Sequence, residues 1–166
     1  MFVVDTNVLV YAIVEACPEH AVCLERLERW RESQIPWFTT WPILYETMRV
    51  VTHRRAVRSP WKLDRAAGFV KALLASPSLK LLTPTGEHSS VLARTVEEVP
   101  GLAGSILHDL HTVVLMREHG IRRIVTRDAD FHRFPFLEVL DPLRPERPDA
   151  VRERGRRRRG ASVVNQ

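Results

Sequence analysis

The chain has 166 residues, of which 45% are hydrophobic, and a formal net charge of +5. This length and composition predict one globular domain with a single buried core. No apolar run approaches the roughly 18 residues that a membrane-spanning helix needs. The apolar opening segment lacks a basic leader, which argues against a signal peptide. We therefore expect a cytoplasmic protein that makes no membrane contact.

The excess positive charge lies at the C-terminal end. Residues 143–166 contain eight arginines and three acidic residues, whereas residues 1–142 contain 17 basic and 17 acidic residues. The end segment is rich in Arg, Pro and Gly and has few large apolar residues, which is typical of disorder. We therefore expect a folded domain at 1–142 and a disordered tail at 143–166. The run Arg156–Arg159 either binds phosphate groups or only aids solubility.

Strand and helix patterns alternate through the first half of the chain. A short apolar strand at 2–5 leads into a helix that begins at Thr6 or Asn7. The elements that follow are a helix at 20–33, a strand at 35–40, a helix opened by Pro42, a helix at 61–76 and a strand at 79–84.

The same alternation continues in the second half. A helix runs from Glu87 to Glu98, and another begins at Ser105 and ends at Gly120. Strands at 121–126 and 137–142 complete the pattern. Strands separated by helices predict an α/β fold, in which a mostly parallel sheet of four or five strands carries helices on both faces.

The cysteines and tryptophans indicate packing more than chemistry. Cys17 and Cys23 are six residues apart, with no second pair or histidine cluster nearby, so we expect free thiols that are buried or half-buried. Trp37, Trp41 and Trp61 could stack on the bases of a single strand. Packing in the core or at a dimer interface is the more ordinary explanation.

Two aspartates follow apolar strands. Asp5 ends the strand at 2–5, and Asp128 follows the β-branched run at 124–126. Each has a structural alternative, because Asp5 could cap the next helix and Asp128 could belong to a surface turn. Parallel strands that end on the same edge of a sheet would instead bring both carboxylates into a ligand-binding crevice.

Two further acids lie on apolar stripes of helices. Asp109 shares its stripe with Ile106 and Val113, and a carboxylate in such company is costly unless it has a partner. Glu46 has an apolar residue on each side in the same way. The alternatives are a favourable interaction of Asp109 with the helix dipole and an ion pair of Glu46 with Arg49.

If these four acids converge, their mutual repulsion calls for a cation. Oxygen ligands without cysteine or a histidine pair favour Mg²⁺ or Mn²⁺ over zinc. Because Mg²⁺ keeps several of its waters, some of the acids would act through water and not touch the ion.

The motifs resemble those of a known family. The segments "VVDTNVLVY", "ILYETMRVVT", "HDLHTVVLMREHGIRRIVTRDADFHRFP" and "LEVLDPL" occur in the order found in the PIN-domain ribonucleases, and the likeness is strongest to the VapC toxins of bacterial toxin–antitoxin pairs. The resemblance covers residues 1–142. It implies a three-layer α/β/α fold, Mg²⁺- or Mn²⁺-dependent endoribonuclease activity, a homodimer and a VapB-type antitoxin as partner.

The resemblance also suggests roles for individual residues. Asp5 and Asp109 match the principal metal ligands, Glu46 and Asp128 match the other two acids of a catalytic quartet, and Asp130 is a less secure neighbour. The residues that match polar groups orienting carboxylates or water are Thr6, Asn7 and Thr126. His108 and His111 flank Asp109; either could contact RNA, although a structural role is more usual, and His111 stands where the family pattern has a small residue.

The implied reaction is hydrolysis of an RNA phosphodiester by a water activated by the cation, leaving a 5′-phosphate and a 3′-hydroxyl. Two other functions stay open. The first is a phosphatase in which Asp5 is the nucleophile, although Asn7 replaces the usual second acid and no lysine follows residue 80. The second is a non-catalytic RNA-binding or regulatory module with the same fold.

Overall fold

The computed structural model describes residues 1–145, and within them the chain forms a sheet of five parallel strands in the order β3-β2-β1-β4-β5. The strands are β1 (Val3–Val4), β2 (Trp37–Thr40), β3 (Leu79–Leu82), β4 (Arg123–Val125) and β5 (Glu138–Leu140). The predicted fifth strand is present, and the mostly parallel sheet is parallel throughout. Of the predicted tail at 143–166, residues 146–166 lie outside the described part of the chain.

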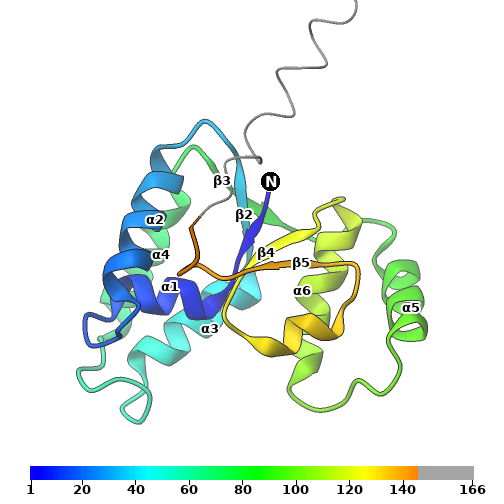
Figure 1. Cartoon of the computed structure of the whole chain (residues 1–166). Helices are drawn as coiled ribbons and strands as arrows, with labels where there is room; N and C mark the ends of the chain where they lie inside the picture. The colour runs from blue at the N-terminus through cyan, green and yellow to red at the C-terminus, as the bar shows by residue number, and fades with distance from the viewer. Residues whose placement is uncertain (146–166) are drawn as a thin grey trace, which may run out of the picture.

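Six α-helices are described, and they form two layers around the sheet. They are α1 (Thr6–Ile13), α2 (His20–Glu32), α3 (Trp41–Thr52), α4 (Leu63–Leu74), α5 (His88–Glu98) and α6 (Ile106–Glu118). In Figure 1, α1 to α4 lie toward the left and α5 lies at the right, while α6 overlaps β4 and β5 in this view. Right-handed crossovers produce this division, because β1, β2 and β3 advance across the sheet in one direction and the chain then returns to β4. The expected three-layer α/β/α fold is confirmed.

Every observed α-helix and strand falls inside its predicted range, except that α3 begins one residue before Pro42. The reason is the capping of α3 by Thr40, whose hydroxyl accepts a hydrogen bond from the Ile43 N–H at 3.3 Å. Pro42 therefore sits in the first turn, where its missing N–H costs nothing. Gly120 ends α6 with a φ of +65°, and the Ile121 N–H returns to the Met116 carbonyl at 2.8 Å, which is the expected C-terminal arrangement.

The core fixes α6 against the centre of the sheet. Val3 on the central strand β1 and Ile124 on its neighbour β4 have no exposed surface, and neither have Val113 and Met116 on α6. Burial of a side chain of this size contributes about 1.5–3 kcal/mol. The first turn of α6 is therefore held in a fixed position beside the sheet.

The remaining packing predictions can be judged residue by residue. Cys23 is buried and Cys17 half-buried, and both are free thiols, as expected. Trp37 is fully buried, and its Nε1 donates to Ser78 Oγ at 3.1 Å. Trp61 packs beside a small second core cluster, whereas Trp41 is 44% exposed. Within residues 1–145, no helix is long and apolar enough to cross a membrane.

The strand order creates a switch point between β1 and β4. The chain leaves β1 through α1 toward β2, whereas it leaves β4 through a short 3-10 helix, η1 (Ala129–Arg133), toward β5 on the opposite side. In parallel sheets, connections that diverge in this way leave a crevice at the carboxyl ends of the two strands, where ligands bind. Asp5 and Asp128 both follow these two ends.

Candidate active site

Asp5 is held at the end of β1 by three hydrogen-bond donors. Its Oδ1 accepts from the Thr6 N–H at 2.7 Å, and its Oδ2 accepts from Thr126 Oγ1 and Asn7 Nδ2, both at 2.7 Å. Only 8% of Asp5 is exposed. Asp5 also caps α1, so the capping explanation is correct. A cap and a functional carboxylate are compatible here, because the same side chain faces the crevice end of β4.

Thr126 and Asn7 link the two middle strands at this edge. Besides donating to Asp5, the Thr126 hydroxyl accepts from Asn7 Nδ2 at 2.7 Å and from the Asp128 N–H at 2.9 Å. The side-chain oxygen Asn7 Oδ1 accepts from the Arg127 N–H at 3.2 Å. The network fixes one orientation of the Asp5 carboxylate and connects it directly to the segment that carries Asp128.

Three aspartates gather beside this network. Asp109, Asp128 and Asp130 each place one carboxylate oxygen within 4.8 Å of the others. Asp109 is half-buried in the first turn of α6, whereas Asp128 and Asp130 are exposed. Asp128 caps η1 by accepting from the Asp130 N–H at 2.9 Å, and this turn brings Asp130 round to the same side. Asp130, the least secure of the predicted acids, therefore lies in the same group as Asp109 and Asp128.

Repulsion and burial shift the acid equilibria of this cluster. Burial, and then the charges of Asp5, Asp128 and Asp130, raise the pKa of Asp109 to about 7. Burial also raises the pKa of Asp5 to about 6, against the opposing hydrogen bonds from Thr126 and Thr6, and the charge of Asp128 adds to the increase. The cluster therefore carries more negative charge than its surroundings within the described chain stabilise.

Glu46 lies at the margin of this cluster. Its two carboxylate oxygens accept from Arg49 Nε at 2.6 Å and Arg49 Nη2 at 2.5 Å, so the alternative of an ion pair with Arg49 is correct. This hydrogen bonding lowers the pKa of Glu46, and the charge of His108 acts in the same direction. The charge of Glu46 nevertheless contributes to the raised pKa of Asp5, which places it near the other acids.

Two predicted participants have other contacts. The Thr6 hydroxyl donates to the Ile43 carbonyl on α3 at 3.5 Å, so only the backbone N–H of Thr6 contacts the Asp5 carboxylate. The His111 ring packs edge-on against His88 on α5, with centroids 5.5 Å apart. His88 in turn contacts Glu118 at 2.7 Å. These contacts favour a structural role for His111.

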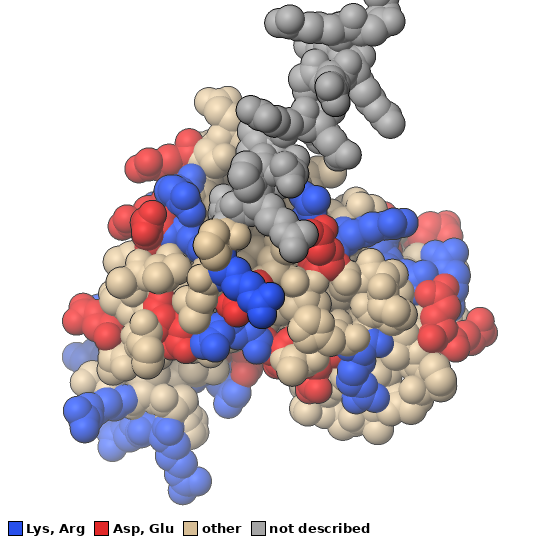
Figure 2. Space-filling model, in the orientation of Figure 1, with Lys and Arg blue, Asp and Glu red and all other residues tan. Residues whose placement is uncertain are grey.

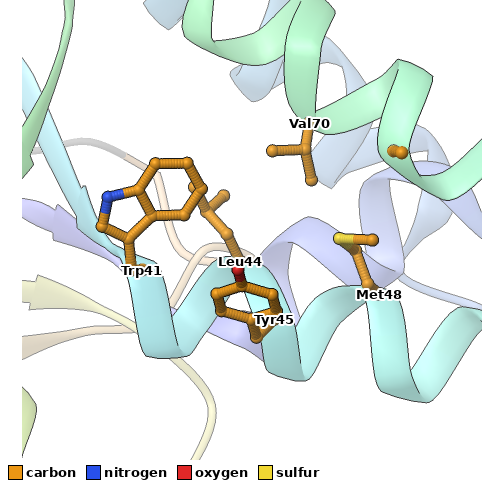
Figure 3. Close-up of a pocket in the computed structure, with 6 residues that line it drawn as sticks. Trp41, Leu44, Tyr45, Met48 and Val70 are labelled. Atoms are coloured by element: carbon orange, nitrogen blue, oxygen red, sulfur yellow. The ribbon is translucent and has the colours of Figure 1, made fainter.

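A separate apolar hollow lies between α3 and α4. It has a volume of about 160 Å³ and is lined by Trp41, Leu44, Tyr45, Met48, Ala67 and Val70. Figure 3 shows Trp41, Tyr45 and Met48 projecting from α3 and Val70 facing them from α4. None of the lining residues carries a carboxylate, so this hollow is distinct from the acidic cluster.

The acidic cluster suits a hard divalent cation. Its donors are carboxylate oxygens, which Mg²⁺ and Mn²⁺ prefer, and the group contains no cysteine or histidine. Among the described residues, no side chain donates to the half-buried Asp109 carboxylate. A half-buried carboxylate without a donor is costly, and a bound cation would remove that cost. The residues present therefore fit the metal that the sequence predicts.

Comparison with known proteins agrees with this fold. The PIN domain family model matches residues 2–137. Ribonuclease VapC37 of Mycobacterium tuberculosis is 32% identical over 134 residues, which cover 81% of this chain and 92% of the relative.

Solved structures share the fold at lower identity. The structure of M. tuberculosis VapC20, described as a Sarcin-Ricin loop cleaving toxin, has a TM-score of 0.62 and 20% identity, covering 85% of this chain and 100% of that one. The structure of VapBC2 from Rickettsia felis, bound to a DNA fragment from its promoter, has a TM-score of 0.58 and 18% identity, covering 83% and 96%. The chain therefore belongs to the PIN-domain family, among the VapC ribonucleases.

Proposed function

We propose that this chain is a Mg²⁺- or Mn²⁺-dependent endoribonuclease that acts as the toxin of a VapBC-type pair. The observation that carries the proposal is the cluster of Asp109, Asp128 and Asp130 beside the buried Asp5, at the switch point of the sheet. Membership of the PIN-domain family supports RNA as the substrate.

In the proposed site, Asp5 and Asp109 are the principal ligands and Asp128 and Asp130 complete the acidic ring. A bound divalent cation would supply an activated water and neutralise charge on the phosphoryl oxygens. The chain's own groups prepare the site for that role. Asn7 and Thr126 hold the Asp5 carboxylate by donation, which favours its ionised form, and the rigid first turn of α6 fixes Asp109 opposite it.

The site is tested by replacing Asp5 or Asp109 with Asn. Both variants should lose cleavage of RNA while they retain the circular dichroism spectrum of the parent, because the change removes charge and little volume. Asp64→Asn is the matched control, since Asp64 is an exposed acid in the first turn of α4. Near-normal metal-dependent cleavage by Asp5→Asn and Asp109→Asn would reject the proposed site.

The metal is tested separately from cleavage. After treatment with EDTA, calorimetric titration with Mn²⁺ should show binding to the parent chain that Asp109→Asn weakens strongly. Activity restored by Mg²⁺ or Mn²⁺ but not by Zn²⁺ would agree with an all-oxygen site. Equal Mn²⁺ binding by the parent and the variant would place the metal elsewhere.

We also propose a VapB-type antitoxin and a homodimer as the assembly. The shared fold with VapBC2 supports the first partner, and the family resemblance supports the second. Co-expression with the product of an adjacent small reading frame, followed by sedimentation analysis, tests both. A monomer at micromolar concentration would contradict the homodimer.

The contacts of Asp5 disfavour the phosphatase alternative. Both of its oxygens accept hydrogen bonds, one of them from the asparagine that replaces a second acid. A trapped phospho-aspartate would nevertheless establish that reaction. Failure of the purified chain to cut any RNA in the presence of Mn²⁺ would favour a non-catalytic RNA-binding module.

A further inference from the structure

A row of basic side chains follows α3, on the connection to α4 and in the first turn of α4. We call it the basic ridge, and it consists of Arg54, Arg55, Arg58, Lys62 and Arg65, all of them exposed. Figure 2 shows blue atoms gathered at the lower left end of the molecule, where Figure 1 places this connection. From residue 49 to residue 65 there are six basic residues and one acid, whereas the rest of residues 1–142 has 11 basic and 16 acidic residues. The folded domain therefore has no net charge, but its basic residues are concentrated in this segment and its acidic residues elsewhere.

The backbone of the ridge is ordered by its own contacts. Val57 is 8% exposed and anchors the middle of the connection. The Trp61 N–H donates to the Val51 carbonyl at 2.8 Å, which closes the connection back onto the end of α3. The Arg65 guanidinium lies 4.0 Å from the centre of the Trp61 ring. The arginine side chains between these anchors extend from a fixed backbone, so binding a ligand would not require ordering of the loop.

The charges of the ridge are not neutralised within the described chain. Arg117 and Arg123 each form an ion pair with a glutamate at 2.7 Å. In contrast, no carboxylate of residues 1–145 forms an ion pair with Arg54, Arg55 or Arg58. A row of exposed arginines without counter-charges favours a ligand with several anionic groups at regular spacing, because guanidinium groups bind phosphate well.

The helix α3 connects the ridge to the acidic cluster. Glu46 lies on α3, and its charge contributes to the raised pKa of Asp5. Arg54 begins the ridge eight residues further along the chain. The helix ends at Thr52, so the six residues from Glu46 to that end rise about 9 Å at 1.5 Å per residue. A stacked strand that rises roughly 3.4 Å per nucleotide covers this helical distance in about three nucleotides.

We propose that the basic ridge binds the sugar–phosphate backbone of the RNA on one side of the cleaved bond. The proposal rests on the proposed nuclease function and adds to it a surface that holds the substrate. Arg49 lies between the ridge and the acids, but it is already paired with Glu46 and is left out of the test.

The test compares two triple variants of the full chain, each in the Asp109→Asn background with EDTA so that the RNA stays intact. The ridge variant is Arg54→Gln, Arg55→Gln and Arg58→Gln. The control variant, Lys80→Gln, Arg94→Gln and Arg122→Gln, removes the same charge from exposed positions on other elements. Binding of a fluorescent single-stranded RNA is measured by anisotropy at several KCl concentrations.

Each lost phosphate contact should reduce the slope of log K against log salt by about 0.7, so the ridge variant should lose about 2 from the slope. The control variant should keep the slope of its parent. Equal slopes for the two variants would overturn the proposal and leave an acidic protein partner as the ligand of the ridge. Cleavage by the chain with Asp109 intact, measured in parallel with Mn²⁺, shows whether the nuclease proposal itself has failed.

Discussion

Asp109→Asn should stabilise the metal-free protein, although it should destroy the proposed site. Burial and neighbouring acids raise the pKa of Asp109 from 3.8 to about 7. The folded protein then holds this proton more tightly than the unfolded chain does. The contribution of this bound proton to the free energy of unfolding is therefore complete below about pH 4, and it is lost as the pH rises through about 7. Asparagine avoids this loss because it carries no charge at any of these pH values.

The magnitude follows from the size of the shift. At about 1.36 kcal/mol per pKa unit, the full shift corresponds to about 4 kcal/mol, and we reduce this to about 2 kcal/mol because solvent screens the half-buried carboxylate. At 2–4 °C per kcal/mol for a chain of this size, the variant should melt about 4–8 °C above the parent at pH 8. The difference should shrink toward zero near pH 4.

Thermal melting followed by circular dichroism in EDTA, from pH 4 to pH 8, tests this expectation. Asp64→Asn is again the control, because it removes an exposed first-turn acid and should show no such dependence on pH. Added Mn²⁺ should raise the melting temperature of the parent more than that of Asp109→Asn. Parallel melting curves for the parent and Asp109→Asn across the pH range would refute the crowding of charge in the proposed site.

Three further changes probe the surroundings of the site. Thr126→Val removes a donor to Asp5, so the pKa of Asp5 should rise further above about 6 and the pH–rate profile should move to higher pH; an unmoved profile would contradict the network. Arg49→Gln releases Glu46 from its ion pair, so calorimetry should show tighter Mn²⁺ binding with little change in stability, and unchanged affinity would show that Glu46 does not influence the metal. Replacing Arg156–Arg159 with serine should reduce the salt dependence of RNA binding if the tail contacts phosphate, and an unchanged slope would leave it only a solubilising role.

Local chemistry makes the elements of this fold readable from sequence. The apolar runs, the proline in the first turn of α3 and the glycine after α6 each act over a few residues. Asp109 could be identified for a similar reason, because its apolar neighbours lie on its own helix. The prediction of a cation also needed only the number and type of the acids, which the sequence gives directly.

The contacts between distant segments could not be read in the same way. The hydrogen bond from Thr126 to Asp5 joins residues 121 positions apart. It depends on the register that pairs Val4 with Val125, which neither segment specifies alone. The position of Asp130 depends on the 3-10 turn that Asp128 caps. This turn spans only five residues, which are too few to show a periodic pattern in the sequence.

The separation of charge in this domain bears on how an acidic site can act on a polyanion. The acids that suit a cation also repel RNA, so the attraction must come from elsewhere on the molecule. The basic ridge begins beyond the end of α3, which itself lies about 9 Å along the helix from Glu46, whereas the Debye length is about 8 Å at physiological ionic strength. Its field at the acids is therefore largely screened, and the ridge acts by contact with the bound strand and not by shifting the acid equilibria. Substrate binding and preparation of the catalytic carboxylates are consequently separable tasks, the first carried by the segment that follows α3 and the second by the acidic cluster.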